Sequence, residues 1–268
     1  MFRPLLAAAH DGPWEPVTDG ESEASVFRSG DGSRKALYAK CVPAASTSSL
    51  EEERDRVEWL GGQGIPGPRV LDWLVTQDAA CLVTSAVRGI PGDQVTAPEL
   101  RAAWERIADA VRLLHDVPVR ACPFDRDLTR MFATARDVVA RGAVSPEFLP
   151  EEQRRTPPDE LLARLVPQVE QRLAQEAAEA VVCHGDLCLP NIVLDPESLD
   201  VAGFIDLGRL GRADPYADIA LLLANSRETW ADDRQAYAAD DAFAERYGIA
   251  LDRDREAFYL HLDPLTWG

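Results

Sequence analysis

A short region in the second half of the chain holds a histidine, two aspartates and an asparagine in an order that suits chemistry. Residues 184–191 read HGDLCLPN, and residues 203–208 read GFIDLG. An apolar run precedes each polar turn, at residues 181–182 and 201–205, and predicts a strand that leads into it. Carboxylate and amide oxygens are ligands that Mg²⁺ prefers, and a carboxylate can also accept a proton. The pattern therefore indicates a site that holds a metal and moves a proton.

The order H-x-D-x-x-x-x-N followed by D-x-G is that of a kinase catalytic loop and its metal-binding aspartate. Asp186 would orient or accept the proton of the attacking hydroxyl, a step that typically contributes about 10²–10⁴ in rate. Asn191 and Asp206 would hold Mg²⁺, and His184 would brace the loop. The alternative is two surface turns, which are often rich in Asp, Asn and Gly. Because the spacing matches at every chemical position, we favour phosphoryl transfer.

Composition limits the classes of protein to be considered. The chain has 268 residues, 46% of them hydrophobic and 28% charged, with a net charge of −18. These values predict a globular, cytoplasmic protein, and we expect a monomer without a membrane span. The acidic balance argues against nucleic acid and anionic membranes as partners, and it permits a cationic substrate. The five cysteines are scattered without a C-x-x-C pair, so we expect free thiols.

The elements needed to position these residues divide the chain into two expected lobes. Residues 1–86 are predicted to be β-rich with one helix, which places Lys40 on a strand at 36–42 and Glu53 on a helix at 50–60. Glu53 shares the face of Val57 and Leu60. A carboxylate facing inward needs a partner, so we predict that it pairs with Lys40, which would hold the nucleotide phosphates. The alternative is that Glu53 is one of three solvated acids at 51–53.

Residues 87–268 are predicted to be mainly helical. One helix carries an apolar stripe from Leu100 to Leu114, and further helices are expected at about 128–141, 159–178, 216–230 and 252–262. Strands are also expected at 69–74 and 81–84, in the first lobe. The predicted fold class is α+β, with a β-rich N-terminal lobe and a mostly helical C-terminal lobe that carries the catalytic loop and the acceptor site.

The chain resembles the aminoglycoside phosphotransferases, bacterial antibiotic-resistance kinases with a two-lobed protein-kinase-like fold. The similarity covers nearly the whole chain. Within the family, it is strongest to the branch that phosphorylates the 3″-hydroxyl of streptomycin. The segments that carry it are WEPVTDGES, ERDRVEWL, CPFDRDLTRMF, VVCHGD, IDLGRLGRADPYAD and FYLHLDPLTWG.

The resemblance implies a role for individual positions. Asp186 matches the catalytic base, Asn191 and Asp206 match the magnesium ligands, and Lys40 with Glu53 matches the phosphate-holding ion pair. The remaining positions match nucleotide and acceptor contacts: Ser22 in the nucleotide-positioning loop, Thr84 and Ala86 in the adenine-binding hinge, and Glu228, Asp263 and Gly268 near the acceptor. The implied cofactors are ATP and Mg²⁺, with ATP bound between the lobes, and the implied partner is a cationic aminoglycoside.

Some positions depart from related enzymes and bear on the substrate. Ala224 and Asn225 stand where kanamycin-type 3′-phosphotransferases carry arginine and aspartate, which favours streptomycin. Streptomycin carries guanidinium groups, which carboxylates bind in a bidentate manner. We therefore expect an acidic cluster drawn from Glu228, Asp263 and either Asp125 or Asp127. For the last two, we favour the alternative that they are solvated acids at a helix start.

Two alternative functions remain open at this point. The chain could be a kinase of the same fold that acts on another antibiotic, on choline or on a hydroxylated metabolite. It could also be a non-catalytic protein that binds a nucleotide or a drug, although the complete set of Lys40, Asp186, Asn191 and Asp206 argues against this. The choice between ATP and GTP is likewise open.

Overall fold

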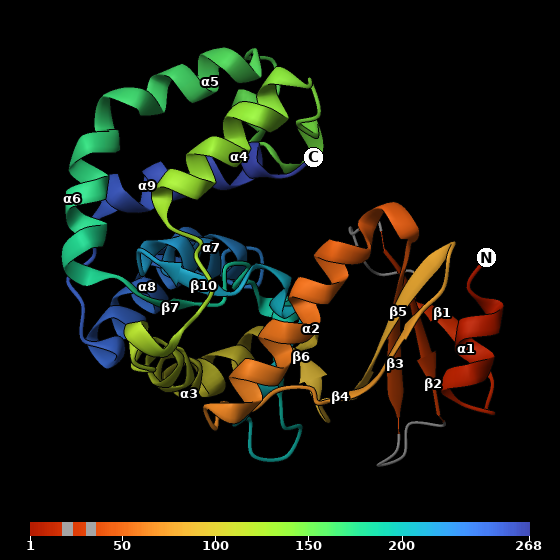
Figure 1. The fold of residues 1–268 in the computed structure, drawn as a ribbon. Helices are drawn as coiled ribbons and strands as arrows, with labels where there is room; N and C mark the ends of the chain where they lie inside the picture. The colour runs from red at the N-terminus through yellow and green to blue at the C-terminus, as the bar shows by residue number, and fades with distance from the viewer. Residues whose placement is uncertain (18–23, 31–35) are drawn as a thin grey trace. The chain divides into compact units, whose positions relative to one another are not determined.

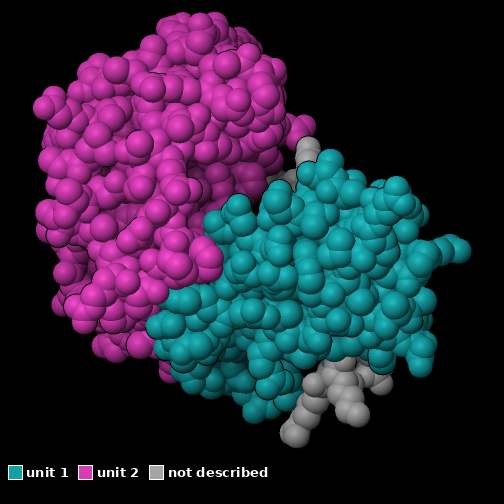
Figure 2. Space-filling model, viewed as in Figure 1, with its two compact units in different colours: residues 1–91, 191–208 teal, residues 92–190, 209–268 magenta. Residues whose placement is uncertain are grey.

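The computed structural model describes residues 1–17, 24–30 and 36–268. The chain forms two compact units, shown in different colours in Figure 2. The first comprises Met1–Pro91 and Asn191–Gly208, and the second comprises Gly92–Pro190 and Arg209–Gly268. We expected a division between residues 86 and 87. The first unit extends five residues further and also takes in the segment 191–208, which we had assigned to the helical lobe.

Strands dominate the first unit. Within its described residues, a five-stranded antiparallel sheet has the order β1-β2-β3-β5-β4. Its strands are β1 Trp14–Val17, β2 Ser25–Ser29, β3 Leu37–Pro43, β4 Val70–Val75 and β5 Ala79–Ser85. The predicted strands 36–42, 69–74 and 81–84 correspond to β3, β4 and β5.

Two helices cover opposite faces of this sheet (Figure 1). Helix α1, Arg3–Ala9, packs Leu5 and Leu6 against the face that carries Ala39 and Cys41. Helix α2, Thr47–Gly62, packs Leu50 against Val42 and Leu82 on the other face. The strict alternation of side chains along β3 produces this division, and it places Lys40 on the α2 side, as predicted.

A smaller sheet explains why residues 191–208 belong to the first unit. Strand β8, Ile192–Leu194, pairs on one side with β6, Ile90–Pro91, and on the other with β9, Val201–Phe204. The backbone N–H of Phe204 also donates to the carbonyl of Pro66 at 3.0 Å. The strand that leads into Asp206 is thereby fixed to the first unit by backbone hydrogen bonds.

The second unit is mainly helical, which confirms the predicted α+β class. Strands β7, Val181–Cys183, and β10, Gly211–Ala213, form an antiparallel pair in it. Its helices are α3 Ala97–His115, α4 Leu128–Ala140, α5 Pro158–Leu165, α6 Val169–Glu179, α7 Tyr216–Ser226, α8 Asp233–Tyr247 and α9 Arg253–Leu262. The predicted apolar stripe of α3 is buried, from Leu100 to Leu114.

Five features of the helices differ from the predictions. The helix expected at 159–178 is two helices, because Pro167 lies in a short 3-10 segment between α5 and α6. The helix expected at 216–230 ends at Ser226, and α8 after it was not predicted. Helix α1 was not predicted either. Helix α2, expected at 50–60, begins at Thr47 and continues through Gly62.

All five cysteines are free, as predicted. Cys41 and Cys81 face each other across β3 and β5 with their sulfur atoms 2.9 Å apart. Among the described residues, no helix combines the length and the apolar character needed to cross a bilayer.

Candidate active site

In the first unit, three charged side chains meet beside the middle of β3. The Lys40 Nζ atom lies 2.8 Å from Glu53 Oε2 and 3.0 Å from Asp206 Oδ1. Glu53 is held by α2, whose residues Val57 and Leu60 on the same side are buried. The predicted ion pair between Lys40 and Glu53 is therefore present, and Asp206 is a second acidic partner.

Electrostatics keep Lys40 protonated in this cluster. Burial disfavours the charge on Lys40, but the attraction of Glu53 and Asp206 outweighs it and raises the pKa of Lys40 above its ordinary value. Burial also raises the pKa of Glu53, and the adjacent ammonium group of Lys40 opposes that rise. A lysine that stays charged and is held by two carboxylates is suited to bind an anion such as a phosphate.

Asp206 has an unusual backbone. Its φ of 59° lies in the left-handed region, which non-glycine residues seldom adopt. The preceding residue, Ile205, donates its N–H to the carbonyl of Asn191 at 3.0 Å, so the two expected metal-binding positions lie next to each other. The Asp206 side chain is 46% exposed. One exposed carboxylate and a nearby amide provide the hard oxygen atoms that Mg²⁺ requires, so the residues present fit this ion.

The expected nucleotide contacts are only partly described. Ser22 lies outside the described residues. Thr84 stands in β5 in register with Tyr38 of β3 and Val70 of β4. The N–H of Ala86 donates to the carbonyl of Ala36 at 3.0 Å. Any contact of Ala86 with a base would therefore use its carbonyl oxygen.

In the second unit, the loop after β7 carries Asp186. The N–H of Asp186 donates to Nδ1 of the fully buried His184 at 3.2 Å, so this ring nitrogen is the acceptor. His184 thus braces the loop, as predicted. Gly185 has a φ of +84°, and a Cβ atom there would overlap the carbonyl oxygen of Arg209. Only glycine fits this turn.

A buried carboxylate anchors the same loop, a role that no motif in the sequence predicted. Asp218 on α7 accepts hydrogen bonds from the N–H groups of His184 at 2.6 Å and Gly185 at 2.8 Å. His115 of α3 lies 3.1 Å away through Nε2, and its Nδ1 lies 2.8 Å from the hydroxyl of Tyr247. Burial alone would raise the pKa of Asp218, but the interaction with His115 and the other hydrogen bonds hold it below its ordinary value.

The end of α7 lies beside the catalytic loop. The side-chain oxygen of Asn225 accepts a hydrogen bond from the N–H of Leu189 at 2.8 Å. Glu228, an expected acceptor contact, follows three residues later in an exposed turn. Asn225, which we noted only as a departure from kanamycin-type enzymes, therefore connects the loop of Asp186 to the turn of Glu228.

The other expected acceptor residues already have protein partners. Asp263 contacts Arg126 at 3.1 Å and Trp267 Nε1 at 3.0 Å, while the carbonyl of Gly268 accepts from Arg141 at 3.2 Å. Asp125 pairs with Arg212. Asp127 caps the first turn of α4, in agreement with the helix-start alternative.

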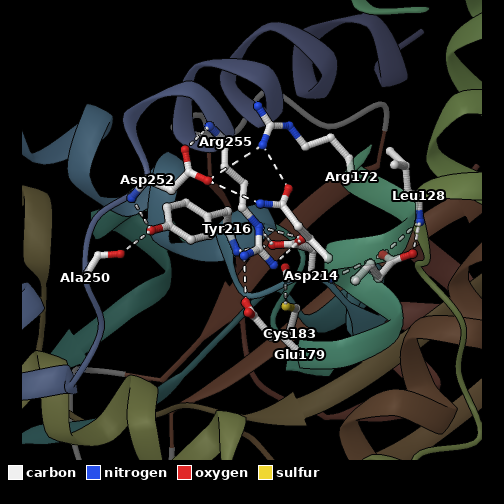
Figure 3. Close-up of polar contacts among 11 residues, drawn as sticks. Leu128, Arg172, Glu179, Cys183, Asp214, Tyr216, Ala250, Asp252 and Arg255 are labelled. Carbon is white, nitrogen blue, oxygen red and sulfur yellow. Dashed lines mark hydrogen bonds and ion pairs between the residues drawn. The ribbon is translucent and has the colours of Figure 1, made fainter. Parts of the chain in front are cut away.

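A buried ionic network supports the helices around β10 (Figure 3). Arg255 of α9 donates to the fully buried Asp214 through Nε at 2.8 Å and Nη2 at 2.6 Å, and to Glu179 through Nη1 at 2.6 Å. The ring of Tyr216 lies against the guanidinium group of Arg255, whose central carbon is 4.9 Å from the ring centre. The network fixes the start of α7, the helix that carries Asp218.

Comparison with known proteins agrees with this geometry. The model of the phosphotransferase enzyme family matches residues 13–259. A streptomycin 3″-kinase of Streptomyces griseus is 66% identical over 257 residues, which cover 96% of this chain and 93% of that protein. An aminoglycoside 3′-phosphotransferase of Streptomyces fradiae is 42% identical, over 93% of this chain and 94% of that protein.

Solved structures agree as well. The aminoglycoside phosphotransferase APH(3″)-Id of Streptomyces rimosus, in complex with ADP and streptomycin, is 68% identical with a TM-score of 0.94, over 100% of this chain and 98% of that one. A type VIII aminoglycoside 3′-phosphotransferase is 35% identical with a TM-score of 0.85, over 98% of this chain and 97% of that one. The chain therefore belongs to the phosphotransferase enzyme family and, within it, to the aminoglycoside phosphotransferases.

Proposed function

We propose that this enzyme transfers the γ-phosphoryl group of ATP to the 3″-hydroxyl of streptomycin. The observation that carries the transfer chemistry is the cluster of Lys40, Glu53 and Asp206, with its contacts of 2.8 Å and 3.0 Å. The choice of streptomycin is supported by the similarity to the Streptomyces griseus kinase and to the Streptomyces rimosus enzyme whose complex contains ADP and streptomycin.

Each residue has a distinct part in the proposed mechanism. Lys40 binds nucleotide phosphate oxygens, and Glu53 orients Lys40. Asn191 and Asp206 hold Mg²⁺, which when bound neutralises charge on the phosphate oxygens. Asp186 aligns the acceptor hydroxyl and accepts its proton as the new P–O bond forms. ADP is the leaving product.

Recognition of the acceptor follows from charge. Streptomycin carries guanidinium groups, which form bidentate hydrogen bonds with carboxylates. Glu228 is exposed and stands next to the catalytic loop through Asn225, so we propose it as a direct contact. The net charge of −18 also favours the approach of a cation.

We further propose that the reaction occurs in the cytoplasm and confers streptomycin resistance, and that the enzyme acts as a monomer without nucleic acid or membrane as a partner. A phosphate adds bulk and negative charge to the drug, which should weaken its binding to the ribosome. Expression of the gene in a sensitive host should therefore raise the streptomycin concentration needed to inhibit growth.

A coupled ATP-turnover assay tests the proposal, with streptomycin, kanamycin, spectinomycin, hygromycin and choline in parallel and mass spectrometry of each product. We expect turnover with streptomycin and one added phosphate, placed at the 3″-hydroxyl by NMR. Turnover with another compound alone would keep the mechanism and refute the acceptor. No turnover with any compound, together with tight ligand binding, would favour a non-catalytic protein.

A further inference from the structure

Arg209 contacts the segment 263–268 through one face of its guanidinium group and through its Nη1 and Nη2 atoms. The guanidinium carbon lies 3.9 Å from the centre of the Trp267 ring, a cation–π distance. Its Nη2 atom donates to Thr266 Oγ1 at 2.5 Å and to the Thr266 carbonyl at 3.3 Å. Its Nη1 atom lies 3.5 Å from Asp263 Oδ1. One side chain thus holds three residues of the segment.

Asp263 makes two further contacts in this group of residues. Its Oδ1 atom accepts from Arg126 Nη2 at 3.1 Å, and its Oδ2 atom accepts from Trp267 Nε1 at 3.0 Å. The side chains of Arg126, Asp263 and Arg209 are 10%, 15% and 19% exposed. These charges are therefore largely withdrawn from water, where paired contacts are stronger than on the surface. We call Arg126, Arg209, Asp263 and Trp267 the arginine clamp.

The arginine clamp also contacts the loop that carries the proposed base. A Cβ atom on Gly185 would overlap the carbonyl oxygen of Arg209 and the Cδ atom of Arg126. Gly185 directly precedes Asp186. Both arginines therefore lie against the turn that fixes Asp186, while their guanidinium groups hold the segment 263–268.

We propose that Arg126 and Arg209 are positioning residues, which hold the segment 263–268 beside the loop of Asp186 and so fix the acceptor site. This inference rests on the proposed function, in which Asp186 meets the acceptor hydroxyl. Asp263 then serves mainly to bind the two arginines, and Glu228 remains the carboxylate that meets the drug. The competing possibility is that Asp263 binds a drug cation directly and independently of Arg209.

A double-mutant cycle separates these possibilities. The variants are Arg209→Gln, Asp263→Asn and the pair combined, with Arg209→Lys as a milder change that keeps the charge but loses the planar contact with Trp267. Arg246→Gln is the matched control, since Arg246 forms an exposed ion pair with Asp109 in the same unit. For each variant we would measure kcat, the KM of streptomycin and of ATP, and hydrogen exchange of residues 263–268 by mass spectrometry.

We expect each single variant to raise the streptomycin KM about tenfold, the scale of one lost charge-assisted hydrogen bond. The double variant should be no worse than the singles, because both disrupt the same cluster. The KM of ATP should stay unchanged, and exchange of residues 263–268 should become faster. Arg209→Lys should be intermediate, and Arg246→Gln should resemble the wild type.

Three results would overturn the inference. Unchanged exchange in Arg209→Gln would show that Arg209 does not hold the segment. Faster exchange with an unchanged streptomycin KM would show that the segment does not fix the acceptor. If the two single effects on the streptomycin KM multiply in the double variant, Asp263 binds the drug independently of Arg209. If the wild type does not phosphorylate streptomycin at all, the proposed function fails, and hydrogen exchange still decides whether the clamp holds the segment.

Discussion

Asp186 depends for its position on the hydrogen bonds of its neighbours. His184 accepts from the Asp186 N–H, Asp218 accepts from the N–H groups of His184 and Gly185, and Asn225 accepts from that of Leu189. The loop is therefore fixed through its backbone at several points. The side chain of Asp186 is partly exposed, as its proposed contact with a hydroxyl group requires.

Replacing Asp186 with alanine should lower kcat by about 10²–10⁴, the usual contribution of a positioned acid or base. Nucleotide affinity should change little, because the proposed phosphate and metal ligands are Lys40, Asn191 and Asp206. Steady-state kinetics with streptomycin and calorimetric titration with ADP would measure both. Asp241→Ala, on the exposed side of α8, is the control. A near-normal kcat in Asp186→Ala would refute the assignment of the base.

The sequence indicated the site residues that are part of short motifs, but not those that support them. Asp186, Asn191 and Asp206 follow from spacing, and the pairing of Lys40 with Glu53 follows from strand and helix periodicity. Asp218 and His115 are separated by 103 positions and meet only in the folded unit. The sequence contained a signal, since Asp218 closes the DPYAD segment, but no local rule states which backbone groups a buried carboxylate will bind.

Helix α9 illustrates how an element is held by one buried side chain. Arg255 is 3% exposed and offers N–H groups to Asp214, which is fully buried. Burial raises the pKa of Asp214, and Arg255 opposes this rise. The network in Figure 3 therefore depends on a charge pair whose members cannot be removed singly without leaving a buried charge.

Arg255→Met should destabilise the protein by about 3–5 kcal/mol, because Asp214 would stay buried without its partner. Urea unfolding followed by circular dichroism would measure the free energy of unfolding. Arg246→Met, which removes an arginine from an exposed pair, should leave it nearly unchanged. Equal stability of the two variants would show that the buried pair is not needed.

Glu176 of helix α6 should make the stability of the protein depend on pH. Glu176 accepts hydrogen bonds from the N–H groups of Leu128 at 2.9 Å and Asp214 at 3.2 Å, and burial raises its pKa from 4.5 to about 7. A raised pKa means that the folded protein binds this proton more tightly than the unfolded chain. The stability that the Glu176 carboxyl contributes is fully present below pH 4.5 and is lost as the pH rises to about 7.

Glu176→Gln removes this titration. Relative to the variant, the wild type should lose about 1–3 kcal/mol of unfolding free energy between pH 4.5 and 8, since one pKa unit is worth about 1.4 kcal/mol. Urea denaturation of both proteins across that range would give the difference at each pH. A difference that stays constant, or that grows in favour of the wild type at higher pH, would contradict the assignment.

The helices differ in how well the sequence could predict them, for a physical reason. Helix α3 buries Leu100, Trp104 and Leu114 along one stripe, so its periodicity is plain. Helix α8 buries three alanines and Asp240 together with Phe243 and Tyr247, and its charged residues interrupt the pattern. Small buried residues carry little hydrophobic signal, although they allow the close packing of α8 on α3.

At the scale of the whole molecule, the net charge of −18 sets the field that a charged ligand meets. Ligands of opposite charge should respond to this field in opposite ways. A cationic aminoglycoside is attracted and a nucleotide is repelled, except where Lys40 reverses the sign locally. At about 0.1 M salt this field reaches only about 10 Å from the surface.

The KM of streptomycin should therefore rise several-fold as NaCl increases from about 0.02 to 0.3 M, while the KM of ATP should not rise in parallel. Initial rates at fixed Mg²⁺ and pH would show this. Sucrose at matched osmolality controls for effects of solute and viscosity. A streptomycin KM that is independent of salt would mean that direct contacts, and not the overall field, determine its binding.

At Asp206, the carboxylate proposed for catalysis comes with a left-handed backbone that lowers stability. Its φ of 59° suits glycine better, so Asp206→Gly should relieve local strain at the cost of the carboxylate. A directed-evolution campaign that rewards heat tolerance alone would thus tend to accept glycine here and produce a hardy but inert protein. Screens for a robust enzyme from this chain should therefore select for phosphorylation and thermal survival together.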